Sequence, residues 1–226
     1  MTPIDPVHSC LRCGAPFGDV LCTECATDGG GECVAAVEGD DAGDTAAPQA
    51  VSRTEVGRCL AATVFEGPVP RIIRAYKDAG ERRLGQLLAE LMLDAAEHAE
   101  AVAPHRYNGL LSDADAVTFV PVTSAAFRRR GFDHMECVAS SFAQMAGVPL
   151  LDALVKYGSS DQRALGRVER EAHARGVYEV VEPVAGKRLL LLDDVITTGA
   201  TIRAARSALL EAGARRVDTL AFARVW

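Results

Sequence analysis

Aromatic residues are scarce in this chain of 226 residues: seven phenylalanines, four tyrosines and one tryptophan make up 5% of it. Proteins that bind single-stranded nucleic acid usually stack the bases on aromatic side chains along a basic groove. A surplus of basic residues is also missing, because the formal net charge is −7 at pH 7. Any contact with nucleic acid would therefore need a local basic patch.

Long apolar runs are absent as well. No stretch approaches the roughly 20 apolar residues that span a bilayer. Residues 1–9 carry neither the basic segment nor the apolar segment of a signal peptide. We therefore expect no membrane insertion and a cytoplasmic location, where cysteines more often bind metal or stay free than form disulfides.

Composition divides the chain into three zones. Residues 1–27 are rich in cysteine, residues 28–57 are small and acidic, and residues 58–226 alternate apolar and amphipathic segments. The middle zone cannot bury much surface, so we expect a flexible linker there. In the last zone we expect strands at 60–65, 116–121, 177–181, 188–192 and 217–223, and helices at 69–78, 82–101, 133–146, 164–174 and 200–212. This alternation predicts an α/β domain with a mostly parallel sheet.

Four cysteines form two closely spaced pairs, Cys10 with Cys13 and Cys22 with Cys25. Each pair can bring both sulfur atoms to one metal ion from a single turn, and four thiolates are typical of tetrahedral structural zinc. The spacing therefore predicts a zinc ribbon over residues 1–27 that folds around Zn²⁺. The alternatives are free thiols or a redox pair.

The segment 188–201 has the order of a phosphate and sugar site. An apolar strand leads into Asp193 and Asp194, and a short turn then leads into a helix. Open α/β sheets bind ligands at the carboxyl ends of their strands, and a helix N-terminus suits phosphate. The two carboxylates suit sugar hydroxyls, with Mg²⁺ nearby to offset their charge. We expect the phosphate at Thr197, Thr198, Gly199, Ala200 and Thr201; the alternative is a plain strand followed by a capped helix.

Basic residues elsewhere in the chain could bind a second anionic group, such as pyrophosphate. The stretch Val120-Pro121-Val122 closes a short strand, and Arg128-Arg129-Arg130 follows in what we expect to be a loop. Clustered arginines suit pyrophosphate, although a solvated run of charge is the alternative. Lys77 ends a predicted helix and, taken alone, is an ordinary lysine favoured there by the helix dipole.

Residues 189–201 resemble the signature of type I phosphoribosyltransferases: four apolar residues, Asp-Asp, an apolar residue, any residue, then Thr-Thr-Gly. The chain as a whole resembles the ComF family of competence-associated phosphoribosyltransferase-like proteins. The matching pieces are the paired cysteines, Gly67-Pro68 through Gly80, Val120-Pro121-Val122, Arg130-Gly131-Phe132, and Gln162, Leu165 and Arg170. The resemblance implies a five-stranded parallel sheet with flanking helices and a small hood near the active site.

The resemblance also implies roles for single residues. Asp193 and Asp194 would hold the ribose hydroxyls of phosphoribosyl diphosphate (PRPP), and the turn at 197–201 would hold its 5′-phosphate. Lys77 and Arg130 would join the two aspartates as catalytic residues, and Arg128 and residues 120–122 would contact PRPP. The chain departs from the family at Asp133-His134, usually Asn-Gln, and at His173, usually Asn. These departures bear on the acceptor and pyrophosphate contacts.

Two functions follow as hypotheses. The first is a phosphoribosyltransferase with an unknown acceptor, which stabilises positive charge at C1′ while pyrophosphate leaves. The sequence names no general base; His134 is the nearest by chemistry, although packed or surface histidines are commoner. The second is a non-catalytic sensor of PRPP or a nucleotide that contacts a competence or recombination protein or single-stranded DNA.

Overall fold

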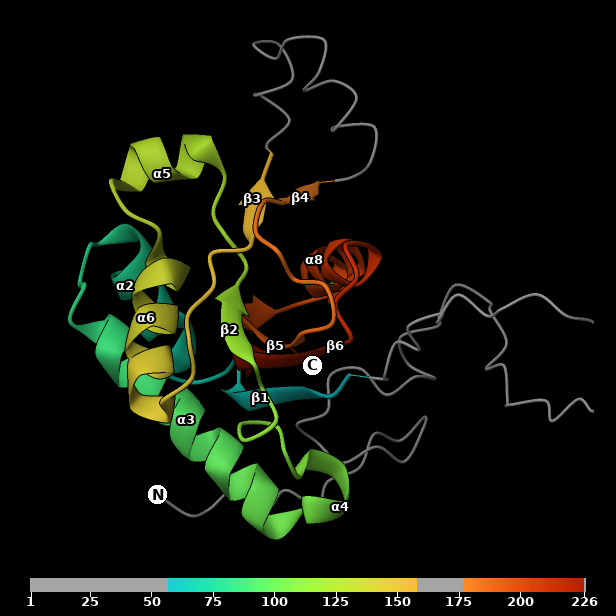
Figure 1. Cartoon of the computed structure of the whole chain (residues 1–226). Helices are drawn as coiled ribbons and strands as arrows, with labels where there is room; N and C mark the ends of the chain where they lie inside the picture. Colours follow the sequence, from blue (N-terminus) through green and yellow to red (C-terminus); the bar gives the residue numbers. More distant parts are fainter. Residues whose placement is uncertain (1–56, 158–176, 226) are drawn as a thin grey trace, which may run out of the picture.

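The computed structural model describes residues 57–157 and 177–225 (Figure 1). The predicted zinc ribbon with Cys10, Cys13, Cys22 and Cys25, nearly all of the predicted linker and the predicted helix at 164–174 lie outside the described residues.

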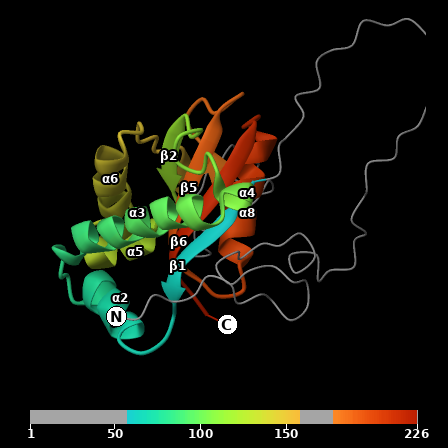
Figure 2. The same cartoon turned by 90° about the horizontal axis from the view of Figure 1, so that it is seen from below.

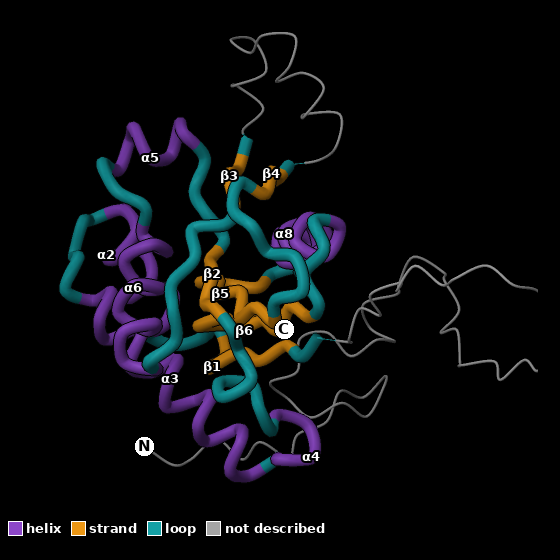
Figure 3. Tube along the Cα trace, in the orientation of Figure 1, coloured by secondary structure: helices purple, strands orange, loops and turns teal. Residues whose placement is uncertain are grey.

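Four parallel strands form the central sheet in the order β1-β6-β5-β2 (Figure 3). These are β1 (Cys59–Val64), β6 (Arg216–Arg224), β5 (Arg188–Ile196) and β2 (Ala116–Phe119). The inner strands β5 and β6 are mostly buried and read as near-continuous apolar runs, as expected for strands covered on both faces. The predicted parallel sheet is confirmed, and β5 extends beyond its predicted end.

The expected fifth parallel strand is reduced, within the described residues, to one bridge between Val117 and Leu150. The Val117 N–H donates to the Pro149 carbonyl and the Leu151 N–H donates to the Val117 carbonyl, each at 2.8 Å. Pro149 has no N–H with which to continue a ladder. The chain then turns, because the Ala153 N–H donates back to the Leu151 carbonyl. The count of five strands was therefore wrong for this part of the chain.

A two-stranded antiparallel ribbon lies apart from the main sheet. It pairs β3 (Leu154–Lys156) with β4 (Tyr178–Val180), and Figure 1 shows it above the sheet beside α8. The strand expected at 177–181 is thus confirmed, but its partner β3 was not expected. The ribbon brings Lys156 to the carboxyl ends of the sheet strands, where the hood was expected.

The helices cover both faces of the sheet (Figure 2). On one side lie α2 (Val69–Asp78), α3 (Leu84–Val102) and α6 (His134–Ala146), and on the other lies α8 (Ala200–Glu211). The short helix α4 (Pro104–Tyr107) follows α3. No helix within the described residues is both long enough and apolar enough to cross a membrane.

The arginines at 128–130 lie on a helix, not on the expected loop. Helix α5 (Ser124–Arg130) begins where the Thr123 hydroxyl accepts a hydrogen bond from the Ala126 N–H at 3.3 Å. It ends at Gly131, whose φ of 76° is left-handed and suits glycine. The positive charges therefore occupy the last turn of α5, where the helix dipole favours them.

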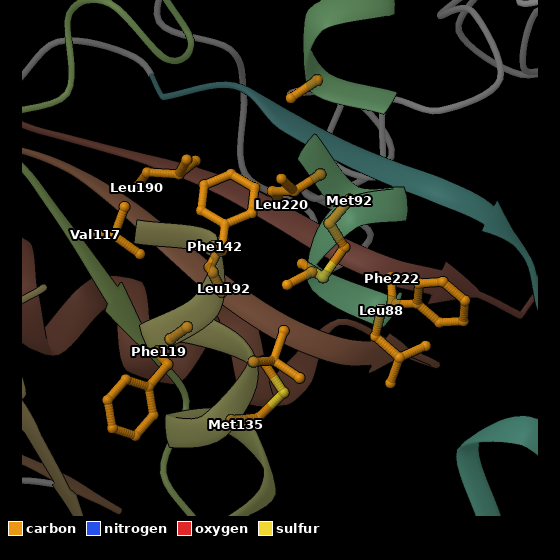
Figure 4. Close-up of a cluster of buried hydrophobic side chains, with 14 of the residues drawn as sticks. Leu88, Met92, Val117, Phe119, Met135, Phe142, Leu190, Leu192, Leu220 and Phe222 are labelled. Carbon is orange, nitrogen blue, oxygen red and sulfur yellow. The ribbon is translucent and has the colours of Figure 1, made fainter. Parts of the chain in front are cut away.

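Alternation along β5 decides which way its side chains point. Leu190 and Leu192 join the core between the sheet and the α3 and α6 helices, where Figure 4 shows them near Phe142. Leu189 and Leu191 join the opposite core against α8. Because strand side chains alternate, Asp193 continues the α8 face and Asp194 the face of α2 and α6.

Loss of a core side chain should cost far more stability than loss of the same side chain at the surface. Phe142 is fully buried, so Phe142→Ala should lower the free energy of unfolding by about 3–5 kcal/mol. Phe127 is 47% exposed, and Phe127→Ala should change it by less than about 1 kcal/mol. Urea unfolding of the two variants measures both values, and equal losses would contradict this packing.

Candidate functional site

Two neighbouring carboxylates lie within the carboxyl end of β5. The strand continues through Asp193 and Asp194 to Ile196, so the pair belongs to the ladder itself. The turn that follows reaches Gly199, whose φ of 72° is left-handed, and α8 starts at the next residue. The order of strand, carboxylates, turn and helix that the sequence predicted is thus present.

Asp194 is held by both helices that face it. Its Oδ2 forms an ion pair with the Lys77 ammonium of α2 and lies 2.7 Å from Nε2 of His134 at the start of α6. Its Oδ1 accepts a hydrogen bond from the Val195 N–H at 2.6 Å. The carboxylate is therefore contacted on both oxygens.

These contacts govern the ionisation of Asp194. Burial alone would raise the pKa of its carboxyl, but the hydrogen bond from His134 and the charge of Lys77 outweigh burial and lower it. Asp194 is therefore an ionised group that only accepts hydrogen bonds.

Asp193 lies in the opposite environment. Its side chain faces the α8 side and is only 5% exposed, and its Oδ1 accepts the Asp194 N–H at 2.9 Å. Burial, and then the charge of Asp194, raise the pKa of this carboxyl. The pKa values of the two adjacent carboxyls are thus shifted in opposite directions, so that Asp193 can donate a hydrogen bond while Asp194 accepts one.

A pocket of about 250 Å³ opens over these carboxylates and is bounded by α2, α5, α6, β3, β5 and the end of β2. Eight of the predicted site residues line it: Lys77, Val120, Pro121, Val122, Arg130, Asp193, Asp194 and Thr201. It is also lined by residues that were not among the predicted site: Thr123, Ala126, His134, Met135, Lys156 and Val195.

The remaining predicted residues lie beside this pocket and do not line it. Thr197, Thr198 and Ala200 are exposed in the turn before α8 or at its start, and Gly199 is buried between them. The Thr198 carbonyl accepts a hydrogen bond from Arg203 Nη1 of α8 at 2.9 Å, which fixes the turn to the helix. The first turn of α8 directs its backbone N–H groups toward this region.

Arg130 supplies a second cation at the pocket. Its Nη2 lies 3.4 Å from Asp78 Oδ1, and its side chain is only 17% exposed. Its Nε is buried and has no hydrogen-bond partner within the described residues. Arg130 lines the pocket, where its guanidinium can donate to an oxyanion.

A second hollow of about 400 Å³ adjoins the first and shares Pro121, Val122 and Lys156 with it. Its walls are largely apolar, from Phe119, Phe127, Leu154 and Val155, and it also has acidic groups at Asp133, Glu136 and Asp152. Arg128 lies here and not in the first pocket.

The pocket residues that were not predicted differ in how clearly the sequence pointed to them. His134 stood at a departure from the family pattern and was named only as a candidate base. Its neighbour Asp133 caps α6 through the Met135 N–H and also accepts the Val122 N–H, each at 2.8 Å, so it ties two walls of the pocket together. The sequence did not point to Lys156, because no local pattern predicted the short strand β3 that carries it.

Comparison with known proteins agrees with this geometry. Residues 118–225 match the family described as Phosphoribosyl transferase domain. The chain is 24% identical over 169 residues to the DNA utilization protein YhgH of Salmonella typhimurium, which covers 74% of this chain and 72% of that protein. It is 31% identical over 105 residues to the competence protein ComFC of Streptococcus pneumoniae, and this alignment covers 46% of each chain. It is 38% identical over 100 residues to an adenine phosphoribosyltransferase of Treponema denticola, spanning 41% of this chain and 47% of that protein.

The parallel sheet, the carboxylate pair and the domain match define a type I phosphoribosyltransferase domain. The likeness of the chain to ComFC and YhgH is consistent with a ComF-type phosphoribosyltransferase-like protein, as its sequence motifs indicated.

Asp193 should make the protein less stable as the pH rises. Between its ordinary pKa of 3.8 and the raised value of about 8, the folded protein keeps a proton that the unfolded chain has released. The contribution of Asp193 to the free energy of unfolding therefore falls with rising pH across this window. Asp193→Asn removes that loss, so the variant should gain stability over the parent as the pH rises from 4 to 8. Thermal unfolding across this range measures the difference, and a pH-independent difference would contradict the assignment.

Proposed function

We propose that the pocket binds PRPP and that the domain transfers its phosphoribosyl group to an acceptor. The observation that carries the proposal is the pair of adjacent carboxyls, Asp193 and Asp194, which line the pocket at the end of β5, just before the turn that leads into α8. Asp194 would accept from one ribose hydroxyl, and Asp193 would hold the other as donor or acceptor. The turn at 197–199 and the first residues of α8, Ala200 and Thr201, would hold the 5′-phosphate.

The diphosphate would lie against the cations of the pocket. Lys77, Arg130 and Lys156 all line it, and each can donate to phosphate oxygens. As pyrophosphate leaves, these fixed positive groups would stabilise the charge that builds up on it.

The pocket suits a magnesium ion that arrives with the ligand. No cluster of three or more histidine, cysteine, aspartate or glutamate side chains within the described residues could hold a metal by itself. Mg²⁺ commonly takes one or two carboxylates together with substrate phosphates, and Asp194 is the ionised carboxylate of this pocket. The ion would neutralise charge on the diphosphate.

The adjoining hollow supports transfer over sensing alone. It shares three residues with the proposed PRPP pocket and is large enough to receive an acceptor. The relatives are described as a competence protein and a DNA utilization protein, and we extend that biological setting to this chain. The proposal places the chain in the cytosol.

Loss of the Asp194 charge should weaken ribose recognition. Asp194→Asn should weaken PRPP binding in the presence of Mg²⁺ at least tenfold, because a charge-assisted hydrogen bond is lost. Asp94→Asn, at an exposed position of α3, is the matched control and should bind as the parent does. Isothermal titration calorimetry measures both affinities, and a parent protein that does not bind PRPP would refute the proposal.

Turnover is tested separately with PRPP, Mg²⁺ and a panel of nucleobases and amines. Pyrophosphate release that depends on an acceptor and is lost in Asp194→Asn would support a transferase. Tight PRPP binding with no release for any acceptor would favour the sensor, which would act on a partner protein or single-stranded DNA.

We further infer from the spacing of Cys10, Cys13, Cys22 and Cys25 that the chain binds one structural zinc ion. Native mass spectrometry should find one zinc atom per chain, and Cys13→Ser should lose it, whereas Cys137→Ser should retain it. Full zinc retention by Cys13→Ser would contradict a four-cysteine site.

A further inference from the structure

The His134 ring is fixed by the elements around it. It is the first residue of α6, directly after the capping residue Asp133, and its side chain is 7% exposed. The Tyr76 hydroxyl of α2 donates to the His134 carbonyl at 2.5 Å, and the two rings meet edge to face with centroids 6.2 Å apart. Tyr76 is itself 1% exposed, so the ring has little freedom to turn.

The polar contact of this ring is directed at Asp194. Nε2 lies 2.7 Å from Asp194 Oδ2, and because an ionised carboxylate only accepts, Nε2 carries the hydrogen. The other nitrogen, Nδ1, is buried and has no partner within the described residues. The ring therefore orients one carboxylate and makes no second polar contact with the described chain.

Lys77 contacts the same oxygen but is held far less tightly. It follows Tyr76 on α2, its side chain is 22% exposed, and its ammonium sits at the end of a flexible four-carbon stem. A ligand that enters the pocket can displace this ammonium without moving any backbone. It cannot displace the His134 ring without disturbing Tyr76 and the start of α6.

We propose that His134 is the positioning residue of the ribose-binding carboxylate, and that Lys77 exchanges Asp194 for a diphosphate oxygen when the ligand binds. This inference rests on the proposed function, because it assigns two residues of the same pocket to separate parts of PRPP. The sugar hydroxyl takes the place of the ammonium on Asp194 Oδ2, while the hydrogen bond from His134 stays in place. The released ammonium meets the phosphate, and Asp194 keeps the hydrogen bond from His134 and gains one from the sugar hydroxyl.

Three ligands separate the two roles: PRPP with Mg²⁺, ribose 5-phosphate, and pyrophosphate with Mg²⁺. His134→Leu should weaken PRPP and ribose 5-phosphate about tenfold and leave pyrophosphate unchanged. His134→Gln, which keeps an N–H donor, should restore most of that affinity. Lys77→Met should weaken PRPP and pyrophosphate by a similar factor, and should bind ribose 5-phosphate as well as or better than the parent, because a competitor for Asp194 is gone.

His98→Leu on the exposed face of α3 and Lys187→Met at the opposite end of β5 are matched controls that should change none of the three affinities. Nitrogen-15 NMR of the ligand-free protein tests the ring without any variant, and it should report a hydrogen on Nε2 of His134. A ring protonated on Nδ1 alone, or His134→Leu that binds ribose 5-phosphate as the parent does, would overturn the inference. A parent that binds none of the ligands would overturn the proposed function instead, and the inference with it.

Discussion

The buried charge of Asp194 is the interaction on which the rest of the site depends. A carboxylate taken out of water at the end of a buried strand must be compensated or lose its charge. Here Lys77 and His134 come from two separate helices and meet at one carboxylate oxygen. Burial, and then the ionised state of Asp194, raise the pKa of Asp193, so the state of each carboxyl depends in part on that contact.

The fold supplies this compensation through the alternation of β5. Because Leu190 and Leu192 pack toward α6 while Leu189 and Leu191 pack toward α8, the next two residues must point to opposite faces. Tyr76 then links the two helices that carry the compensating groups, since it precedes Lys77 on α2 and hydrogen-bonds the backbone of His134 on α6. Core packing and site electrostatics are therefore parts of one arrangement.

Much of the central fold and the ligand half of the site could be predicted from sequence, because the signals there are local. An apolar strand, two aspartates and a Thr-Thr-Gly turn occupy consecutive positions, and the structure keeps them together. The errors arose where a local cap was not recognised or where distant segments decide the outcome. The fifth strand stops at one bridge after Pro149, the arginines at 128–130 lie on a helix because Thr123 caps it, and Lys156 reaches the pocket only through pairing with β4. The contact of His134 with Asp194 spans 60 residues and no local pattern encodes it.

The central claim is that Asp193 and Asp194, the two adjacent carboxyls at the end of β5, hold the ribose of PRPP. A crystal structure of the complex with PRPP and Mg²⁺ tests it most directly. The account predicts both ribose hydroxyls within hydrogen-bond distance of Asp193 and Asp194, His134 still on Asp194, and the Lys77 ammonium on the diphosphate. A ribose bound away from the two aspartates, or a Lys77 that stays on Asp194 in the complex, would contradict it.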